Sequence, residues 1–231
     1  ELIINLTYKF STKIIVVSKG IKSDLIKVNK NLKKKIKVIY NPIIKNNNKK
    51  KFTNKNSSLK KKIWGKNISN RVLSVGSLKV QKDYFNLIKA FSLLKNLSKT
   101  KLLIVGNGPL KNELKKYVKK LNLKEKVFFV GFKKNLDAFY QTANLFVVSS
   151  MWEGFSNVIV ESLGFGLPVV STNCKSGPSE ILKNGKYGTL VPIQNSFKLS
   201  EAIFKNLKKN HNKKKLINRS LDFEISKISN Q

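Results

Sequence analysis

The sequence predicts an α/β protein built around a doubly wound parallel sheet, and two observations carry this prediction. From residue 71 onward, short β-branched and aromatic runs alternate with segments of helical periodicity, a pattern typical of βαβ units. Several runs end in glycine, as at Gly76, Gly106 and Gly131. Glycine adopts backbone conformations that other residues avoid, so these positions allow tight turns at the carboxyl edge of the sheet. Open α/β sheets bind their ligands at this edge.

The first 70 residues divide into an apolar part and a polar part. Residues 13–18 and 36–40 are predicted strands, with one or two helical turns over 23–28 between them. Lys, Asn and Ser dominate residues 45–70. Because such a stretch buries little apolar surface, it is expected to be a linker or a long surface loop.

The alternation becomes regular after this stretch. The predicted strands are 71–75, 101–105, 127–130, 145–149, 168–171 and 188–191, and the predicted helices are 84–97, 110–121, 136–143 and 157–164. Strands alternating with helices form right-handed crossovers and a parallel sheet with both faces covered. The sequence therefore predicts one doubly wound domain over residues 71–210.

The net charge of +35, from 47 basic and 12 acidic residues, raises the question of an anionic partner. Lysines occur along the whole chain, and Arg71 and Arg219 are the only arginines. Base readout and bidentate phosphate contacts favour arginine. The charge is therefore interpreted mainly as compositional bias. A nucleic-acid partner is disfavoured, and an anionic membrane surface ranks ahead of it.

The single cysteine and the apolar runs exclude two further classes. Cys174 cannot form an intramolecular disulfide and fits a reducing compartment. No apolar run approaches the roughly 20 residues of a membrane-spanning helix.

The strongest site signal lies between Ser149 and Glu161. A strand ends at Ser149, and a helix begins near Ser156 or Asn157, either of which can cap it. The free N–H groups of a helix N-terminus suit a phosphate. Glu153, in the loop, can accept bonds from hydroxyl groups, and Glu161, one turn into the helix, can hold two vicinal hydroxyls. This combination describes a nucleotide sugar. The alternative is that the two acids are a capping residue and a surface residue.

Six blocks of sequence resemble the family 4 glycosyltransferases, which are retaining enzymes of the GT-B fold. The blocks are Gly76-Ser-Leu-Lys-Val-Gln-Lys82, Ile104-Val-Gly-Asn-Gly-Pro109, Val130-Gly-Phe132, Trp152-Glu-Gly-Phe-Ser-Asn-Val-Ile-Val-Glu161, Gly166-Leu-Pro-Val-Val170 and Gly177-Pro-Ser-Glu180. The resemblance covers roughly residues 13–205. The string of six blocks is far more specific than any one of them.

The resemblance implies two catalytic residues. Glu153 would hold and orient the donor sugar near its anomeric carbon. Lys82 would neutralise the leaving diphosphate, so that no divalent metal or other cofactor is expected. Many family members carry arginine where this sequence has Ser77. Lys79 could reach the phosphates instead, although as a point charge it would clamp them less tightly, and it could equally be a surface lysine.

The resemblance also implies the donor-binding residues. Glu161 would hold the ribose hydroxyls, the N–H groups around Asn157 and Val158 would bind the diphosphate, and Phe132 would lie against the base. The complete donor-binding set is Gly76, Lys79, Gly106, Gly108, Gly131, Phe132, Gly154, Phe155, Asn157, Val158 and Glu161.

The resemblance implies a domain organisation as well. Residues 1–44 would be the end of a truncated acceptor-binding domain and 45–70 a linker. Residues 71–210 would form a Rossmann-like nucleotide-sugar-binding domain, and 211–231 would return toward the N-terminal domain. Residue 1 is Glu and the only methionine is Met151, which favours a fragment of a longer enzyme.

The implied function is transfer of a sugar from a nucleotide-diphosphate-sugar donor to a glycan or lipid-linked saccharide, with retention of configuration. The expected enzyme is of the hexosyltransferase type and acts in cell envelope polysaccharide biosynthesis. Its expected location is cytoplasmic, with peripheral contact to the inner face of an anionic membrane. The alternative function is a non-catalytic nucleotide- or polyanion-binding module.

Overall fold

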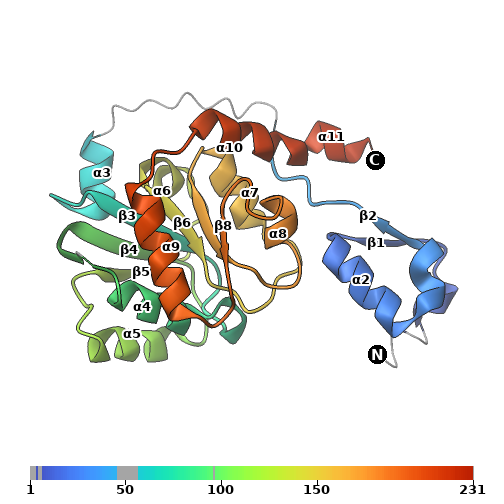
Figure 1. The fold of residues 1–231 in the computed structure, drawn as a ribbon, viewed down its shortest axis with the longest axis horizontal. Helices are drawn as coiled ribbons and strands as arrows, with labels where there is room; N and C mark the ends of the chain where they lie inside the picture. The colour runs from blue at the N-terminus through green and yellow to red at the C-terminus, as the bar shows by residue number, and fades with distance from the viewer. Residues whose placement is uncertain (1–3, 5–6, 46–56, 96, 231) are drawn as a thin grey trace.

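A six-stranded parallel sheet forms the centre of the computed structural model, which describes residues 4, 7–45, 57–95 and 97–230 (Figure 1). Every neighbouring pair of its strands is parallel. The strands are β3 (Asn70–Val75), β4 (Thr100–Val105), β5 (Val127–Gly131), β6 (Leu145–Val148), β7 (Val169–Thr172) and β8 (Thr189–Val191).

The strand order confirms the predicted fold class. The order is β5-β4-β3-β6-β7-β8, so the chain builds outward from β3 in one direction and from β6 in the other. Val72 of β3 lies opposite Leu145 of β6 in the parallel register. The carboxyl ends of β3 and β6 therefore flank the topological switch point, the place where doubly wound sheets bind ligands.

Helices cover both faces of the sheet because its strands are apolar on both sides. In β4, Leu102 and Ile104 belong to one core, and Leu103 and Val105 to the other, as the period of two of a strand requires. The first core packs α4 (Tyr84–Ser92), α5 (Lys111–Lys120) and α9 (Ser196–Lys208). The second packs α3 (Ser57–Trp64), α6 (Asp137–Thr142), α7 (Asn157–Gly164), α8 (Pro178–Ile181) and α10 (Lys213–Ser220).

A smaller unit precedes this domain and lies beside it in Figure 1. Strands β1 (Ile14–Val16) and β2 (Ile36–Val38) pair in parallel and are joined through α2 (Lys19–Val28). Ile14, Val16, Leu32 and Ile36 form its own small core.

The chain passes from this unit toward the six-stranded domain beside the C-terminal segment. The N–H groups of Ile43 and Ile44 donate to the carbonyl of Phe223 at 3.0 and 3.1 Å, and that of Ile225 donates to Ile44 O at 2.9 Å. The C-terminal helix α11 (Ile225–Ser229) follows directly. The rings of Tyr40, Phe155 and Phe223 contact one another, with centroids 5.4–5.7 Å apart.

The structure differs from the predicted elements in several of its helices. Residues 57–64 of the expected linker form α3, because Trp64 is buried against the sheet; residues 46–56 lie outside the described residues. Helix α4 ends at Ser92, so Leu97 is not part of it. Helices α8, α9 and α10 were not predicted, although the buried residues of α9 follow a helical period.

Among the described residues, no helix is both long and apolar enough to cross a bilayer.

Candidate functional site

Glycines bring the loops after β3, β4 and β5 together at the carboxyl edge of the sheet. A Cβ on Gly106 would lie 2.0 Å from the carbonyl oxygen of Gly76, and the φ of Gly106 is +147°, so this position requires glycine. A Cβ on Gly108 would lie 2.5 Å from Leu78 O. The N–H of Gly106 donates to Gly131 O at 2.9 Å. These glycines therefore join the loops by close backbone packing.

Lys82 and Glu153 meet across the switch point. Lys82 follows β3 and Glu153 follows β6, and Lys82 Nζ lies 2.6 Å from Glu153 Oε1. The side chain of Glu153 is only 6% exposed and that of Lys82 is 18% exposed. The hydroxyl of Ser150 donates to the same Oε1 at 2.7 Å, and the hydroxyl of Ser149 donates to Lys82 O at 2.7 Å. The β3 loop and the β6 loop are thereby bonded to each other through polar groups.

The first turn of α7 carries an unpaired hydroxyl. Ser156 is the N-cap residue, in left-handed conformation with φ 80°, and makes no side-chain cap. Asn157 Oδ1 instead accepts a bond from Asn41 Nδ2 at 2.8 Å. The predicted start of the helix is confirmed, with Ser156 as the N-cap residue, but the expected side-chain cap is absent. The reason is that Ser156 has φ 80° and ψ 68°, whereas a residue that caps a helix with its side chain typically has an extended backbone.

This turn presents several hydrogen-bond donors together. The first N–H groups of a helix have no intrahelical partner. Ser156 Oγ is buried and has no hydrogen-bond partner among the described residues. A buried unpaired polar group is costly unless a ligand or water satisfies it. The first turn of α7 is therefore suited to an anionic group such as phosphate.

Glu161 lies on α7 and is hydrogen-bonded to a buried tyrosine. The hydroxyl of Tyr140 donates to Glu161 Oε2 at 2.8 Å. Burial, and next the charge of Glu161, raise the pKa of Tyr140 well above its ordinary value. The phenol therefore stays protonated and remains a donor.

A third carboxylate, Glu180 on α8, binds the smaller N-terminal unit. Its oxygens accept the N–H groups of Lys19 and Gly20, the first two residues of α2, at 2.8 and 3.0 Å. The hydroxyl of Tyr40 also donates to it at 3.1 Å. Gly20 is required here, since a Cβ would lie 2.3 Å from Ser176 Oγ. A carboxylate at a helix N-terminus is favoured by the helix dipole.

Two of the predicted donor-binding residues stand apart from these contacts. Lys79 is exposed, and Phe132 is 73% exposed. Gly154 lies against Ile21 of the smaller unit, and Phe155 is buried.

Among the residues described, no group of three or more His, Cys, Asp or Glu side chains could hold a metal ion.

Sequence reasoning missed three residues that the structure attaches to the predicted ones. Ser150 is bonded to Glu153 and lies inside the segment from Ser149 to Glu161, but no role was predicted for it; Tyr140 is bonded to Glu161 and belongs to no motif. Glu180 did belong to one of the six blocks, although no contact was predicted for it. Its partners on α2 lie 160 residues away in the chain.

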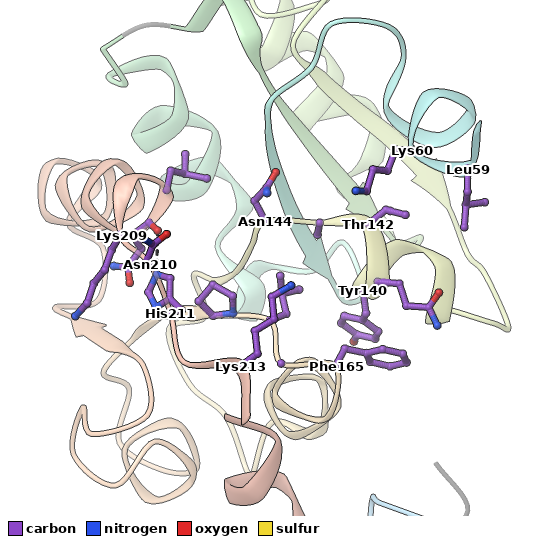
Figure 2. Close-up of a pocket in the computed structure, with 17 residues that line it drawn as sticks. Leu59, Lys60, Tyr140, Thr142, Asn144, Phe165, Lys209, Asn210, His211 and Lys213 are labelled. Atoms are coloured by element: carbon purple, nitrogen blue, oxygen red, sulfur yellow. Dashed lines mark hydrogen bonds between the residues drawn. The ribbon is translucent and has the colours of Figure 1, made fainter. Parts of the chain in front are cut away.

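A pocket of about 400 Å³ lies elsewhere, at the amino ends of β6 and β7 (Figure 2). Figure 2 shows Tyr140 and Phe165 together at one end, and Lys209, Asn210 and His211 at the other. Three of its 17 lining residues are lysines, close to the basic fraction of the chain, 47 of 231. Its charge therefore reflects composition and marks no particular ligand.

The doubly wound order, with polar side chains and a helix N-terminus at the switch point, defines a Rossmann-like domain. The model of the family described as glycosyl transferases group 1 matches residues 56–222. The chain belongs to this family, which confirms the resemblance to the GT-B glycosyltransferases.

Two curated relatives illustrate the match. One is N-acetylgalactosamine-N,N'-diacetylbacillosaminyl-diphospho-undecaprenol 4-alpha-N-acetylgalactosaminyltransferase of Campylobacter jejuni, 35% identical over 88% of this chain and 53% of its own length. The other is an uncharacterized glycosyltransferase of Methanocaldococcus jannaschii, 39% identical over 54% of this chain and 34% of its own length. The chain thus spans about half or less of the length of these two relatives.

A solved structure confirms the fold. The crystal structure of Anabaena HepE in complex with UDP and glucose has a TM-score of 0.85 and is 22% identical, over 100% of this chain and 64% of HepE. At this identity the likeness establishes the fold alone.

Proposed function

We propose that this protein transfers a sugar from a nucleotide-diphosphate-sugar donor to a glycan or lipid-linked saccharide acceptor, with retention of configuration. The contact between Lys82 and Glu153 carries this proposal. It joins a fixed cation to a carboxylate at the switch point, beside the donor-rich first turn of α7. Membership of a glycosyltransferase family supports the reaction class.

Each group has a defined task in this reaction. The bond between the anomeric carbon and the diphosphate breaks, and the electron pair stays on the diphosphate. The acceptor oxygen bonds to the anomeric carbon, and its proton passes to an oxygen of the leaving diphosphate. Lys82 neutralises the leaving diphosphate, and the first N–H groups of α7, at Asn157 and Val158, bind it. Lys79 lies on the same loop as Lys82 and is proposed as a secondary phosphate contact.

The two acids hold the parts of the donor on either side of the diphosphate. Glu153 Oε1 is occupied by Lys82 and Ser150, so Oε2 is the oxygen proposed to accept a sugar hydroxyl, next to Gly154 and Phe155. Glu161 accepts the two ribose hydroxyls. Phe132 lies beyond Gly131, where its exposed ring can meet the base. No divalent metal is required in this scheme, because Lys82 supplies the positive charge.

The known relatives narrow the choice of substrates to test. HepE was crystallised with UDP and glucose, which makes uridine-diphosphate sugars the first donors to try. The Campylobacter relative is named for a diphospho-undecaprenol-linked saccharide, which supports a lipid-linked acceptor. We further propose that the transferred sugar is a hexose. The protein is proposed to work in the cytoplasm, on the inner face of an anionic membrane.

We propose that residues 71–210 hold the donor. Residues 1–44 and 211–231 belong to the side of the molecule that meets the acceptor. The contacts of Tyr40 and Phe223 with Phe155 support this arrangement, since they connect both segments to the loop that carries Glu153.

Calorimetry with uridine, guanosine and adenosine diphosphates tests donor binding. We expect the protein to bind one of the three, and Glu161→Ala to weaken that binding. Losing hydrogen bonds to a charged group costs about 1.5–3 kcal/mol, which is roughly a 10- to 100-fold loss of affinity. Glu113→Ala, an exposed acid on α5, is the matched control. Equal affinity of Glu161→Ala and parent would remove the ribose role.

Donor turnover tests the catalytic role of Lys82. In a screen of nucleotide sugars, release of the nucleoside diphosphate should fall more in Lys82→Ala than donor binding does, because the contact strengthens as the leaving group gains charge. A chelator should leave turnover unchanged. Binding without turnover in the parent protein would favour the non-catalytic nucleotide- or polyanion-binding module instead.

A further inference from the structure

The contact between Tyr140 and Glu161 fixes one oxygen of the carboxylate proposed to hold the ribose. The two residues lie on α6 and α7, and the hydroxyl of Tyr140 donates to Glu161 Oε2 at 2.8 Å. Tyr140 is 2% exposed, so water does not compete for this bond.

The tyrosine ring is held rigidly by its neighbours. Figure 2 shows the Tyr140 ring beside Phe165. The two rings are stacked, with centroids 5.4 Å apart and an interplanar angle of 18°. Phe146 packs against it at 5.6 Å. A ring locked on two sides holds its hydroxyl at one point in space.

The helix that carries Tyr140 is anchored at its C-terminal end. Trp64 Nε1 donates to the hydroxyl of Thr142 at 2.8 Å, and Arg71 Nε donates to the Thr142 carbonyl at 2.6 Å. Trp64 is 1% exposed. The helix that carries the phenol is therefore anchored by α3 and β3, in addition to the stacking of the ring on Phe165 at the end of α7.

The chemistry of the contact leaves the carboxylate free to bind further groups. Tyr140 stays a neutral donor, since burial and the charge of Glu161 raise its pKa far above the working range. An ionised carboxylate has about four acceptor sites, and Tyr140 takes one. The remaining sites face in a fixed direction, because a carboxylate held at one oxygen no longer rotates freely.

We infer that Tyr140 is a positioning residue that orients Glu161 toward two vicinal hydroxyls, and so makes the site selective for ribonucleotides over 2′-deoxyribonucleotides. This inference rests on the proposed function. A carboxylate can bind two hydroxyls at a fixed separation only in one orientation. A carboxylate that binds a single hydroxyl can do so in several orientations, so fixing its orientation matters less. Tyr140 therefore contributes to binding only when both hydroxyls are present.

Calorimetry with Tyr140→Phe and two paired probes tests the inference. The probes are uridine diphosphate and 2′-deoxyuridine diphosphate, or the guanosine or adenosine pair if the parent protein binds that base. We expect the ribonucleotide affinity to fall by about 5- to 10-fold and the deoxyribonucleotide affinity by about 2-fold or less, so that the ratio between the two shrinks. Tyr117→Phe, the same change on α5 beside Phe85, should leave the ratio unchanged.

A double-mutant cycle separates positioning from general destabilisation. If Tyr140 acts through Glu161, Tyr140→Phe should not change the ribonucleotide to deoxyribonucleotide ratio in a Glu161→Ala background, which has no acceptor for the tyrosine hydroxyl. A loosened fold would instead lower both affinities in either background. Thermal unfolding of each variant verifies that the fold is retained, as expected because phenylalanine keeps the stacked ring.

The outcomes for the inference and for the proposed function are distinct. If the parent binds a nucleoside diphosphate and Tyr140→Phe leaves the ratio unchanged, this inference is overturned and the proposed function stands. If the parent binds none of the three diphosphates, the proposed function fails and the inference fails with it.

Discussion

At the scale of single residues, Lys82 and Glu153 form the most consequential contact of the site. Glu153 is almost fully buried, and Lys82 is its cationic partner. Removing one member of such a pair leaves the other charge uncompensated. A phosphate that attracts Lys82 would therefore also act on Glu153, so that the proposed diphosphate and sugar positions are electrostatically linked.

The sequence predicted some of these residues and could not predict others. Lys82 and Glu153 lie 71 residues apart, and the resemblance placed both in one site because each belongs to its own motif. Ser150 and Tyr140 are neutral residues in ordinary contexts. Their roles depend on which side chain faces them after folding, and local pattern does not encode that.

Cys174 provides a residue-scale prediction. It is 3% exposed, and burial, followed by the nearby charge of Glu153, raises the pKa of its thiol to about 11. At pH 8 the thiolate fraction is then roughly 100-fold below that of an ordinary cysteine. We expect Ellman's reagent to react at least about 100-fold more slowly with the native protein than with protein unfolded in about 6 M guanidinium. The signal is unambiguous because Cys174 is the only cysteine. Equal rates would show that the thiol is accessible.

At the scale of elements, the strands were predicted within a residue or two because buried parallel strands are continuous apolar runs. Helix α3 was missed for a physical reason. Its sequence is rich in lysine, and the helix is anchored by the burial of Trp64 rather than by a long apolar stripe. For α9 the signal was present, since buried Leu199, Ala202 and Ile203 follow a helical spacing.

Helix α2 provides an element-scale prediction, because Glu180 holds its N-terminus. Burial, and next the charge of Glu180, raise the pKa of Tyr40 to about 12, so Tyr40 remains a donor to this carboxylate. Glu180→Gln keeps the shape but removes the charge that the helix dipole favours, at a cost of about 1–2 kcal/mol. Hydrogen exchange in peptides covering 14–38 should therefore accelerate by roughly 5- to 30-fold.

The control for this variant is Glu201→Gln, which removes a fully exposed acid on α9 that pairs only with Lys198 in the described contacts. The six-stranded domain should exchange as in the parent in both variants. If exchange over 14–38 is unchanged in Glu180→Gln, the carboxylate does not hold the smaller unit.

At the scale of the whole molecule, the charge of +35 dominates the electrostatics. The few ion pairs of the described residues include one that is largely buried, Lys82 with Glu153, whereas the pair of Lys198 with Glu201 is more than half exposed. Exposed pairs contribute little. Self-repulsion among lysines therefore opposes the folded state more than surface ion pairs support it.

Salt should consequently stabilise the protein. Raising NaCl from about 20 to about 300 mM shortens the screening length from roughly 20 Å to below 8 Å, and we expect the melting temperature to rise. For a chain of this size, each 1 kcal/mol of relieved repulsion corresponds to about 2–4 °C. Differential scanning fluorimetry across a salt series measures this shift. A melting temperature that falls with salt would mean that the ion pairs outweigh the repulsion.

The overall topology was predictable, but the placement of the smaller unit was not. Alternating strands and helices with right-handed crossovers lead to a doubly wound sheet. The position of the β1–α2–β2 unit instead depends on contacts such as Glu180 with Lys19 and Gly20, which join segments remote in sequence.

The link between the two units is a very short tether. The N–H of Ile39 is bonded to Val16 O at one end, and that of Ile43 is bonded to Phe223 O at the other. Only Tyr40, Asn41 and Pro42 lie between these anchors, so the two anchoring N–H groups are four residues apart and about 13–14 Å from each other at full extension. Proline also has a fixed φ. Asn41 is in turn bonded to Asn157, the first residue of α7. A displacement of the smaller unit by a few ångströms therefore pulls mechanically on the helix end where a diphosphate is proposed to sit.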